Sequence, residues 1–407
     1  MTANEDWGAM ASERLSAIAK ASEPGPGVTR LPFGPEHEAA LDLISEWMRR
    51  AGCSVSLDSA GTLIGRREGP PGAPTLLIGS HQDSVREGGA FDGIMGVALG
   101  CLALEALGAQ ELPFAVEVLA FADEEGVRFP TALIGPRALA GTLDPKVFEM
   151  TDRAGERLGE ALRAFGGDPE KATMLARNPD EIAGYLELHI EQGPVLEAAD
   201  APLGVVTAIS GIERHRVTVT GEAGHAGTVP MEMRHDALLS ASDLVRGVHD
   251  MARDHGIRAT VGQLTVSPNV VNAIPARVDL TIEIRAAEDA ARDAVGAALG
   301  ELCAGIAVET LTEIEIEKTY SQPAQACDPD LRARLAAAVE AATGAPAIEL
   351  PSGATHDASA MADLCPIAML FVRCKGGVSH NPAEEANGAD MGAAVSALAE
   401  FLRRYVP

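Results

Sequence analysis

The sequence predicts an α/β protein with a mainly parallel sheet in its main domain and a smaller α+β domain inserted into it. Strand-like apolar runs alternate with amphipathic helical patterns in the first half of the chain and again near its C-terminus, an order typical of parallel strands joined by helices. The middle third follows a different order of elements. With 407 residues the chain exceeds one average domain, so two domains are expected.

In the main domain, the expected strands cover residues 62–66, 75–78, 115–122, 185–190 and 367–372. Two amphipathic helical patterns lie within residues 10–52, one of them at 36–51. Further helical patterns lie at 96–107, 147–165 and 331–342.

The middle third contains alternating patterns at residues 214–220, 260–266, 277–284 and 308–318, with helical patterns at 235–253 and 288–303. Strand–helix–strand–strand–helix–strand is the order of a ferredoxin-like unit. We therefore expect residues 211–324 to be an inserted domain, and residues 1–210 and 325–407 to form the two parts of the catalytic domain.

Composition excludes several classes of function. The net charge of −27 argues against a nucleic-acid partner, because phosphates favour clustered Lys and Arg. No apolar stretch approaches the roughly 20 residues that cross a bilayer, and the first residues lack a basic and then apolar signal pattern. The six cysteines form no C-x-x-C pair, which favours reduced thiols in a cytoplasmic protein.

Four polar patches follow apolar runs and carry residues typical of metal sites: 79–83 with 91–93, 123–126, 189–193 and 379–382. In open α/β sheets, ligands bind beyond the carboxyl ends of the strands. Three histidines and two carboxylates from these patches would suffice for a pair of divalent cations, with a further acid left as a base. Asp92 has two oxygens that could bridge the cations, and Asp83 could accept the second imidazole N–H of His81.

Each position also has a structural explanation. His189 alone is more often a hydrogen-bonded strand-end residue, Asp92 between glycines is more often a turn residue, and Glu124-Glu125 is more often a solvated strand end. Taken together, charged side chains at the ends of several buried strands carry a desolvation cost that cations would offset. The joint pattern therefore favours the metal site.

The chain resembles the M20 metallopeptidase superfamily, and within it the hydantoinase/carbamoylase amidohydrolases: allantoate amidohydrolases, N-carbamoyl-L-amino-acid hydrolases and β-ureidopropionases. The resemblance rests on GSHQDSVREGGAFDGIMGV (79–97), FADEEGVRFP (121–130), ELHIEQGPVLE (187–197), GHAGTVPMEMRHDA (224–237), SPNVVNAIP (267–275) and GGVSHNPAE (376–384). It implies two divalent metal ions, of which Zn, Mn, Co or Ni would suit the ligands. It also implies that the inserted domain is a lid through which a homodimer forms.

The resemblance also assigns roles to individual residues. It implies that one metal is bound by His81, Asp92 and His189, the other by Asp92, Glu125 and His380, and that Glu124 is the general base. His225 would stabilise the oxyanion in its own or a partner's site. Substrate contacts would come from Gln192, Asn272, Arg285 and His356, although Thr355 stands where this family usually has glycine.

The leading hypothesis is hydrolysis of a ureido or carbamoyl C–N bond in a small N-carbamoyl amino acid or ureido acid, with release of ammonia. Allantoate, N-carbamoyl-α-amino acids and β-ureidopropionate are not distinguished. The alternatives are an aminoacylase- or dipeptidase-like amide hydrolase and a metal-free binding homologue. Glu191 and Glu197 are weaker candidates for the acid, and we expect the remaining histidines at 37, 215, 235, 249 and 255 to lie on the surface.

Overall fold

The computed structural model describes residues 6–407, which form two compact units. Unit 1 comprises the described residues up to Thr207 together with Cys327–Leu350 and Ala354–Pro407. Unit 2 comprises Ala208–Ala326 and Pro351–Gly353.

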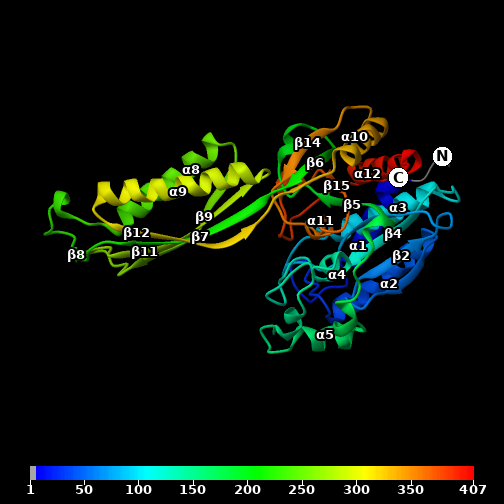
Figure 1. Ribbon diagram of the computed structural model, residues 1–407, viewed down its shortest axis with the longest axis horizontal. Helices are drawn as coiled ribbons and strands as arrows, with labels where there is room; N and C mark the ends of the chain where they lie inside the picture. The colour runs from blue at the N-terminus through cyan, green and yellow to red at the C-terminus, as the bar shows by residue number, and fades with distance from the viewer. Residues whose placement is uncertain (1–5) are drawn as a thin grey trace. The chain divides into compact units, whose positions relative to one another are not determined.

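The large sheet has four parallel strands at its centre and antiparallel strands on both sides (Figure 1). Its order is β1(Ser54–Leu57), β2(Leu63–Arg67), β4(Ala115–Phe121), β3(Thr75–His81), β5(Ile182–Ile190), β15(Ile367–Val372), β6(Leu203–Ile209) and β13(Gln325–Ala326), with β14(Ile348–Ser352) also paired to β6. The expected mainly parallel sheet is confirmed. Since the central strands run in the same direction, their carboxyl ends meet at one edge.

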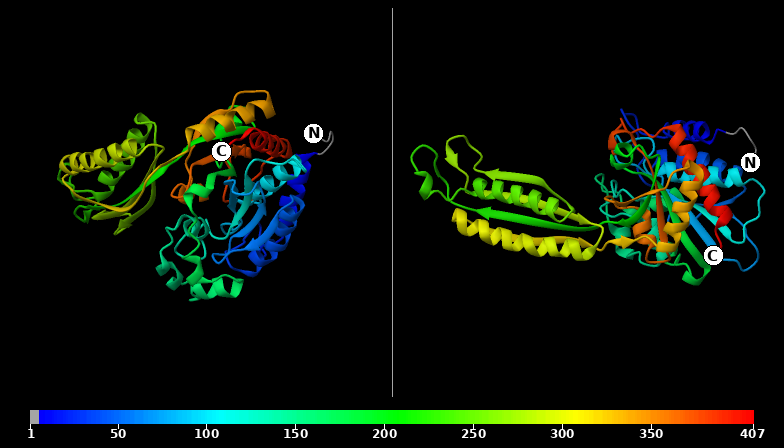
Figure 2. Two further views of the ribbon diagram at one scale, coloured as in Figure 1. Left: turned by 45° about the vertical axis from the view of Figure 1, so that its right-hand side comes forward. Right: turned by 90° about the horizontal axis from the view of Figure 1, so that it is seen from above.

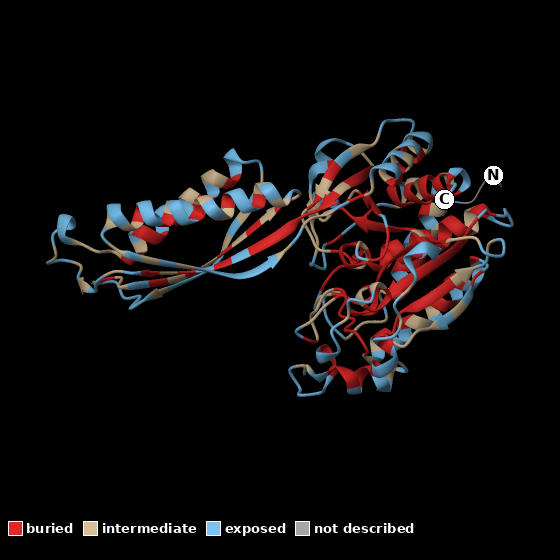
Figure 3. Ribbon diagram, in the orientation of Figure 1, coloured by how far each residue is buried: buried red, intermediate tan, exposed pale blue. Residues whose placement is uncertain are grey.

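Helices cover both faces of this sheet. One face packs against α1(Trp7–Ile18), α2(Pro35–Arg50), α3(Ile94–Leu107), α10(Pro329–Thr343) and α12(Gly388–Arg404) around one apolar core. The other face carries α4(Ile134–Ala140), α5(Leu158–Phe165) and α11(Asp357–Met361), and short helices α6(Pro169–Ala172) and α7(Val195–Ala198) lie in the connections. Helix α3 is buried almost throughout (Figure 3), which explains why its sequence has no polar stripe.

Unit 2 contains a four-stranded antiparallel sheet of order β12(Glu313–Gln322), β7(Gly211–Thr220), β11(Arg277–Ala286) and β9(Arg258–Ser267). Two helices, α8(Ala237–Asp254) and α9(Asp289–Thr310), pack on one face of it around a separate apolar core (Figure 2). A two-stranded ribbon joins β8(Gly224–His225) to β10(Ala273–Ile274).

Two expected elements have different bounds. The helix expected at 147–165 is wrong, because only Leu158–Phe165 is α-helical and a turn with Gly155 at φ +86° interrupts the pattern. The strand expected from residue 308 begins at Glu313, since α9 continues to Thr310. The helix α12 and the strands β1, β6 and β14 were not expected from the sequence.

Two of the five histidines expected on the surface are buried. The Nδ1 of His37 accepts the backbone N–H of Phe33 at 2.9 Å and its ring packs on Phe165; burial, together with Arg30, lowers the pKa of His37 to about 3. His215 lies on the face of β7 toward the helices, with its Nε2 2.6 Å from Glu213. The burial of His37 depends on packing against Phe165, which is distant in sequence, whereas His215 shares the buried face of β7 with Val217 and Val219.

Arg30 connects the N-terminal helix to the loop after β3. Its guanidinium donates to the carbonyls of Gln82 at 2.6 Å, Ile18 at 3.0 Å and Ala21 at 3.1 Å. Burial, partly opposed by Asp83, lowers the pKa of Arg30 to about 10, so the side chain stays charged at neutral pH. It therefore holds the segment that carries His81 and Asp83 against the body of unit 1.

We predict that Arg30→Met strongly destabilises unit 1. The substitution leaves buried carbonyls without donors, at a cost of about 1–3 kcal/mol each. Urea unfolding followed by tryptophan fluorescence would measure this in unit 1 alone, because both tryptophans, Trp7 and Trp47, belong to it. Arg49→Met, at an exposed position on α2, is the control; equal unfolding midpoints for the two variants would contradict the role of Arg30.

Candidate metal centre

The four patches converge at the carboxyl edge of the parallel strands. β3 ends at His81, β4 is followed by Glu124 and Glu125, β5 carries His189 next to its last residue, and the segment after β15 carries His380. The loop between β3 and α3 adds Asp92. The structure therefore brings together all five expected ligands and the expected base.

Asp92 lies at the centre of this cluster. Its Oδ1 is 3.0 Å from His189 Nε2 and 3.7 Å from His81 Nε2, and its Oδ2 is 3.3 Å from His380 Nε2. One carboxylate thus has an imidazole beside each of its oxygens, which is the arrangement required of a group that bridges two cations.

Two groups of ligand atoms lie within 4.8 Å of one another and share Asp92. The first contains His81, Asp92 and His189; the second contains Asp92, Glu125 and His380, with His380 Nε2 3.6 Å from Glu125 Oε2. A third group links His81 to Glu124 and Glu125, so the expected base lies beside both.

Unpartnered buried atoms indicate that these residues fit cations. Glu125 Oε1 is buried without a hydrogen-bond partner, and His189 Nε2 is buried with no aligned hydrogen bond although Asp92 Oδ1 lies 3.0 Å away; both arrangements are costly in a protein interior. Imidazole nitrogens and carboxylate oxygens are also the donors that Zn, Mn, Co or Ni accept. Divalent cations would satisfy these atoms.

Asp83 explains how two adjacent glutamates serve the same site. Its carboxylate accepts the backbone N–H of Glu124 at 3.1 Å and that of Glu125 at 3.2 Å, so the loop bends around it. The expected bond between the Asp83 carboxylate and His81 is not the main contact, because His81 Nδ1 lies 3.0 Å from the backbone oxygen of Asp83 and 3.5 Å from its carboxylate. Asp83 thus supports both the histidine and the glutamates.

The electrostatics of the site also favour cations. Burial raises the pKa of Glu124 well above its ordinary value, and the carboxylates of Glu125 and Asp357 raise it further against the opposing effect of His81. Burial, followed by repulsion from Asp92, raises the pKa of Glu125 to about 7. The hydrogen bond to Asp92 raises the pKa of His380 to about 9. Without cations, the site would therefore hold protons at positions where cations could replace them.

Two of the four expected substrate residues lie beside these ligands. The ring of His356 is 4.5 Å from that of His189, and burial, followed by the charge of His189, lowers the pKa of His356 well below its ordinary value. Gln192 donates from Nε2 to Asp92 Oδ2 at 3.0 Å and to Ser379 at 3.1 Å, while its Oε1 is buried without a partner.

The other two, Asn272 and Arg285, belong to unit 2 together with His225, the residue expected to stabilise the oxyanion, and the three do not gather at one place within it. The backbone oxygen of Asn272 accepts from the N–H of Ala226, next to His225, in the β8–β10 ribbon. Arg285 lies near the far end of β11, where it donates to Glu283 at 2.7 Å and to the carbonyl of Gly353 at 2.6 Å. At about 3.3 Å per residue, the eight steps from Arg277 to Arg285 separate the two ends by roughly 26 Å.

The structure assigns other roles to the weaker acid candidates. Glu191 accepts the backbone N–H groups of Val195 and Leu196 at the start of α7, and Glu197 accepts that of Gly376. Sequence reasoning missed Ser379 and Glu384, whose side chains contact Asp92 or its backbone. The sequence offers little sign of either role: Ser379 directly precedes the candidate ligand His380, and Glu384 is an acid four residues after it.

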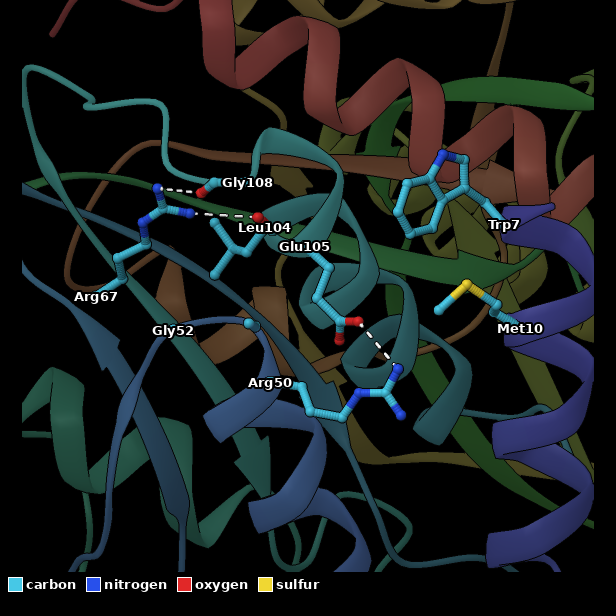
Figure 4. Close-up of a pocket in the computed structure, with 9 residues that line it drawn as sticks. Trp7, Met10, Arg50, Gly52, Arg67, Leu104, Glu105 and Gly108 are labelled. Atoms are coloured by element: carbon cyan, nitrogen blue, oxygen red, sulfur yellow. Dashed lines mark hydrogen bonds and ion pairs between the residues drawn. The ribbon is translucent and has the colours of Figure 1, made fainter. Parts of the chain in front are cut away.

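A hollow of about 500 Å³ lies elsewhere in unit 1, at the C-terminal end of α3. Figure 4 shows Arg67 donating to the carbonyls of Leu104 and Gly108 and Arg50 approaching Glu105. These contacts satisfy the end of a helix, and none of the groups of candidate metal ligands found among the described residues lies there.

The chain is similar to known proteins in sequence and in structure. Residues 77–404 match the model of the peptidase family M20/M25/M40. The chain is 41% identical to an N-carbamoyl-L-amino acid amidohydrolase of Geobacillus stearothermophilus, over 91% of this chain and 92% of the relative, and 38% identical to an allantoate deiminase of Arabidopsis thaliana, over 96% and 81%. A hydantoinase/carbamoylase family amidase from Burkholderia multivorans has a similar structure, with a TM-score of 0.90, 35% identity and 97% of each chain covered.

We predict that cation binding releases protons and strengthens as the pH rises toward 9. Below its pKa of about 9, His380 is protonated in the cation-free site, and a ligand must lose its proton before it binds a cation. Each pH unit below that value should therefore weaken binding about tenfold for each proton displaced. Zn²⁺ titration calorimetry at several pH values, in buffers of different ionisation enthalpy, would measure this.

The control variant His249→Ala, which changes an exposed histidine, should retain the pH dependence of cation affinity. His380→Gln should lose the pH dependence that the wild type shows above pH 7. Affinity that does not change with pH in the wild-type protein would contradict the assignment of His380 as a ligand.

Proposed function

Since this chain belongs to the peptidase family M20/M25/M40, we propose that it is a two-metal amidohydrolase that cleaves a ureido or carbamoyl C–N bond and releases ammonia. Its substrate would be a small N-carbamoyl amino acid or ureido acid. The observation that supports this most directly is the position of Asp92 between three imidazoles, beside Glu124 and Glu125. The names of the relatives that cover nearly the whole chain support the substrate class.

We propose that His81, Asp92 and His189 hold one cation and Asp92, Glu125 and His380 the other. Bound there, divalent cations would polarise the scissile carbonyl and make water a stronger nucleophile at neutral pH.

Glu124 would act as the proton carrier of the reaction. Burial raises the pKa of Glu124 above its ordinary value, so its carboxylate binds a proton more strongly than a solvated one does, which favours its use as a general base. It would take a proton from the attacking water and pass it to the departing nitrogen, which leaves as ammonia. Glu191 and Glu197 are held by backbone N–H groups, so neither is placed to compete for this role.

Gln192 offers a contact suited to a ureido group. Its amide nitrogen donates to Asp92 and to Ser379, and this fixes the orientation of the amide because a carboxylate can only accept. The free, buried Oε1 would accept an N–H from the substrate. His356, kept neutral by burial and by His189, would contribute a hydrogen-bond donor or acceptor and no charge.

The alternatives are less well supported. An aminoacylase- or dipeptidase-like hydrolase would use the same metals, but the relatives reported above carry carbamoylase or deiminase names. A metal-free binding homologue would have no reason to keep the complete set of ligands and the base together.

We also propose that active sites are completed between two copies of the chain, with unit 2 as lid and dimerisation domain. If one substrate contacts His225, Asn272 and Arg285, they cannot all come from the same unit 2, because its sheet separates Arg285 from the other two by far more than the length of a ureido acid. The β8–β10 end also exposes four apolar side chains around His225 and Asn272, which a partner would cover: Met231, Met233, Val270 and Val271.

The β9 edge of the unit 2 sheet is suited to pairing with a second copy. The opposite edge strand, β12, carries Glu313, Glu315 and Glu317, which discourage pairing. β9 has Arg258 as its only charged residue and exposes Leu264, and the neighbouring α8 exposes Leu239 and Val245. A twofold axis at this edge would join the two sheets.

We propose a cytoplasmic location on the basis of the thiols. All six cysteines are unpaired and buried, as expected in a reducing compartment. Among residues 6–407, no helix combines the length and the apolar character needed to cross a bilayer.

We predict that Glu124→Gln keeps its metals but loses turnover about 10²–10⁴-fold, the usual effect of losing a general base. Ammonia release would be measured on metal-reconstituted enzyme with allantoate, N-carbamoyl-L-amino acids and β-ureidopropionate. Glu197→Gln is the matched control and should remain active. Full activity of Glu124→Gln would rule out its role, and release of amino acid from N-acetyl substrates in place of ammonia from ureido substrates would favour the aminoacylase alternative.

We predict that two inactive variants complement each other. In a heterodimer of Glu124→Gln and His225→Ala chains, one site carries both substitutions and the other carries neither, so about half of the wild-type activity should return. The heterodimer would be isolated with two different affinity tags on co-expressed chains. A heterodimer as inactive as either parent would contradict shared sites, and Leu264→Lys in both chains should prevent its formation.

A further inference from the structure

Glu384 connects two segments that carry proposed metal ligands but are 292 residues apart. Its Oε1 accepts the backbone N–H groups of Phe91 and Asp92, each at 3.0 Å, and its Oε2 lies 3.2 Å from the hydroxyl of Ser379, next to His380. The carboxylate is 5% exposed. A buried carboxylate with three donors makes strong, directional contacts.

The loop before α3 is shaped around this carboxylate. A Cβ on Gly89 would lie 2.1 Å from Glu384 Oε1 and 2.2 Å from its Cδ. Gly89 does not have a positive φ, so the reason for a glycine here is space for the carboxylate. The Asp92 loop and Glu384 therefore fit only together.

His380 needs such support more than the other proposed ligands do. It is half exposed and has a φ of +55°, whereas His81 and His189 lie on or at the end of buried strands. No strand ladder fixes its backbone. The bonds from the N–H groups of Phe91 and Asp92 to Glu384 link the Asp92 loop to the His380 segment without using the ligand carboxylate. The bond from Ser379 to Glu384 then ties the residue before His380 to the same carboxylate.

Ser379 has one hydroxyl proton and two possible acceptors, Asp92 Oδ2 at 2.9 Å and Glu384 Oε2 at 3.2 Å. A cation held by Asp92 Oδ2 would compete for the first acceptor. Glu384 then keeps the hydroxyl satisfied and its segment in place.

We propose that Glu384 is a positioning residue that fixes Asp92 and His380 relative to each other, and that it supports the cation held by Asp92, Glu125 and His380 more than the cation held by His81, Asp92 and His189. This rests on the proposed metal centre. The contact to the Asp92 backbone affects both sites, but the contact to Ser379 acts only on the segment that carries His380.

Metal content would test the proposal independently of activity. Wild-type protein, Glu384→Ala and Glu384→Gln would be loaded with Co²⁺, dialysed against graded chelator, and measured for bound ions per chain and for the Co²⁺ absorption spectrum. We expect two ions in the wild type. In Glu384→Ala we expect one ion at nearly wild-type affinity and the other weakened by about 10–100-fold, the usual effect of losing a group that orients a ligand.

Glu384→Gln guards against a folding defect, because its amide oxygen can still accept from the N–H groups of Phe91 and Asp92. Its affinity for the more weakly held ion should therefore fall less than that of Glu384→Ala. The matched control is Glu385→Ala, which removes an exposed partner of Lys375 and should bind as the wild type does. Unchanged binding in Glu384→Ala, or equal weakening of both ions, would overturn the inference while leaving the metal centre intact. A wild type that binds no ions would instead defeat the proposed function.

Discussion

The rest of the site depends on the burial of one carboxylate, Asp92, among three imidazoles at the edge of the sheet. Further carboxylates lie close by, and burial raises the pKa of Glu124 and Glu125. Such a cluster must be neutralised by protons or by cations, because isolated buried charges are costly. The buried Oε1 of Glu125, which has no hydrogen-bond partner, indicates that the protein alone does not satisfy it. The same arrangement that makes the cation-free site hold protons therefore makes it a strong ligand for cations.

Backbone outside the strands must present Asp92, Glu125 and His380, and buried polar side chains hold the loops around the site. Arg30 ties the carbonyl of Gln82, next to His81, to the end of α1. Asp83 bends the Glu124–Glu125 turn, and Glu384 holds the Asp92 loop. Steric space also constrains the site, because a Cβ on Gly93 would lie 2.4 Å from the His81 ring. A sheet can align strand ends to within a few ångströms, but these contacts supply the final placement of the ligand atoms.

The sequence predicted what local pattern and strand direction determine. Apolar runs identified the central strands, and the rule that ligands gather at their carboxyl ends placed His81, His189 and the Glu124–Glu125 pair together. It could not predict contacts whose partners are distant in sequence. Glu384 contacts a loop 292 residues away, and the burial of His37 depends on the position of Phe165. The error at residues 147–165 has a different cause: the apolar period masked a local turn, in which Gly155 has a φ of +86°.

Loading the site with cations would exchange contacts as well as add them. Asp92 Oδ2 already accepts from Gln192 at 3.0 Å and from Ser379 at 2.9 Å, so a cation at this oxygen must displace at least one of these hydrogen bonds. Ser379 has a second acceptor in Glu384, whereas Gln192 has only the hydroxyl of Ser379 as its other contact. The amide released in this way lies beside the proposed reaction centre with both its donor and its acceptor available. A ureido group offers the complementary acceptor and donor, so cation loading itself would prepare Gln192 to bind the substrate.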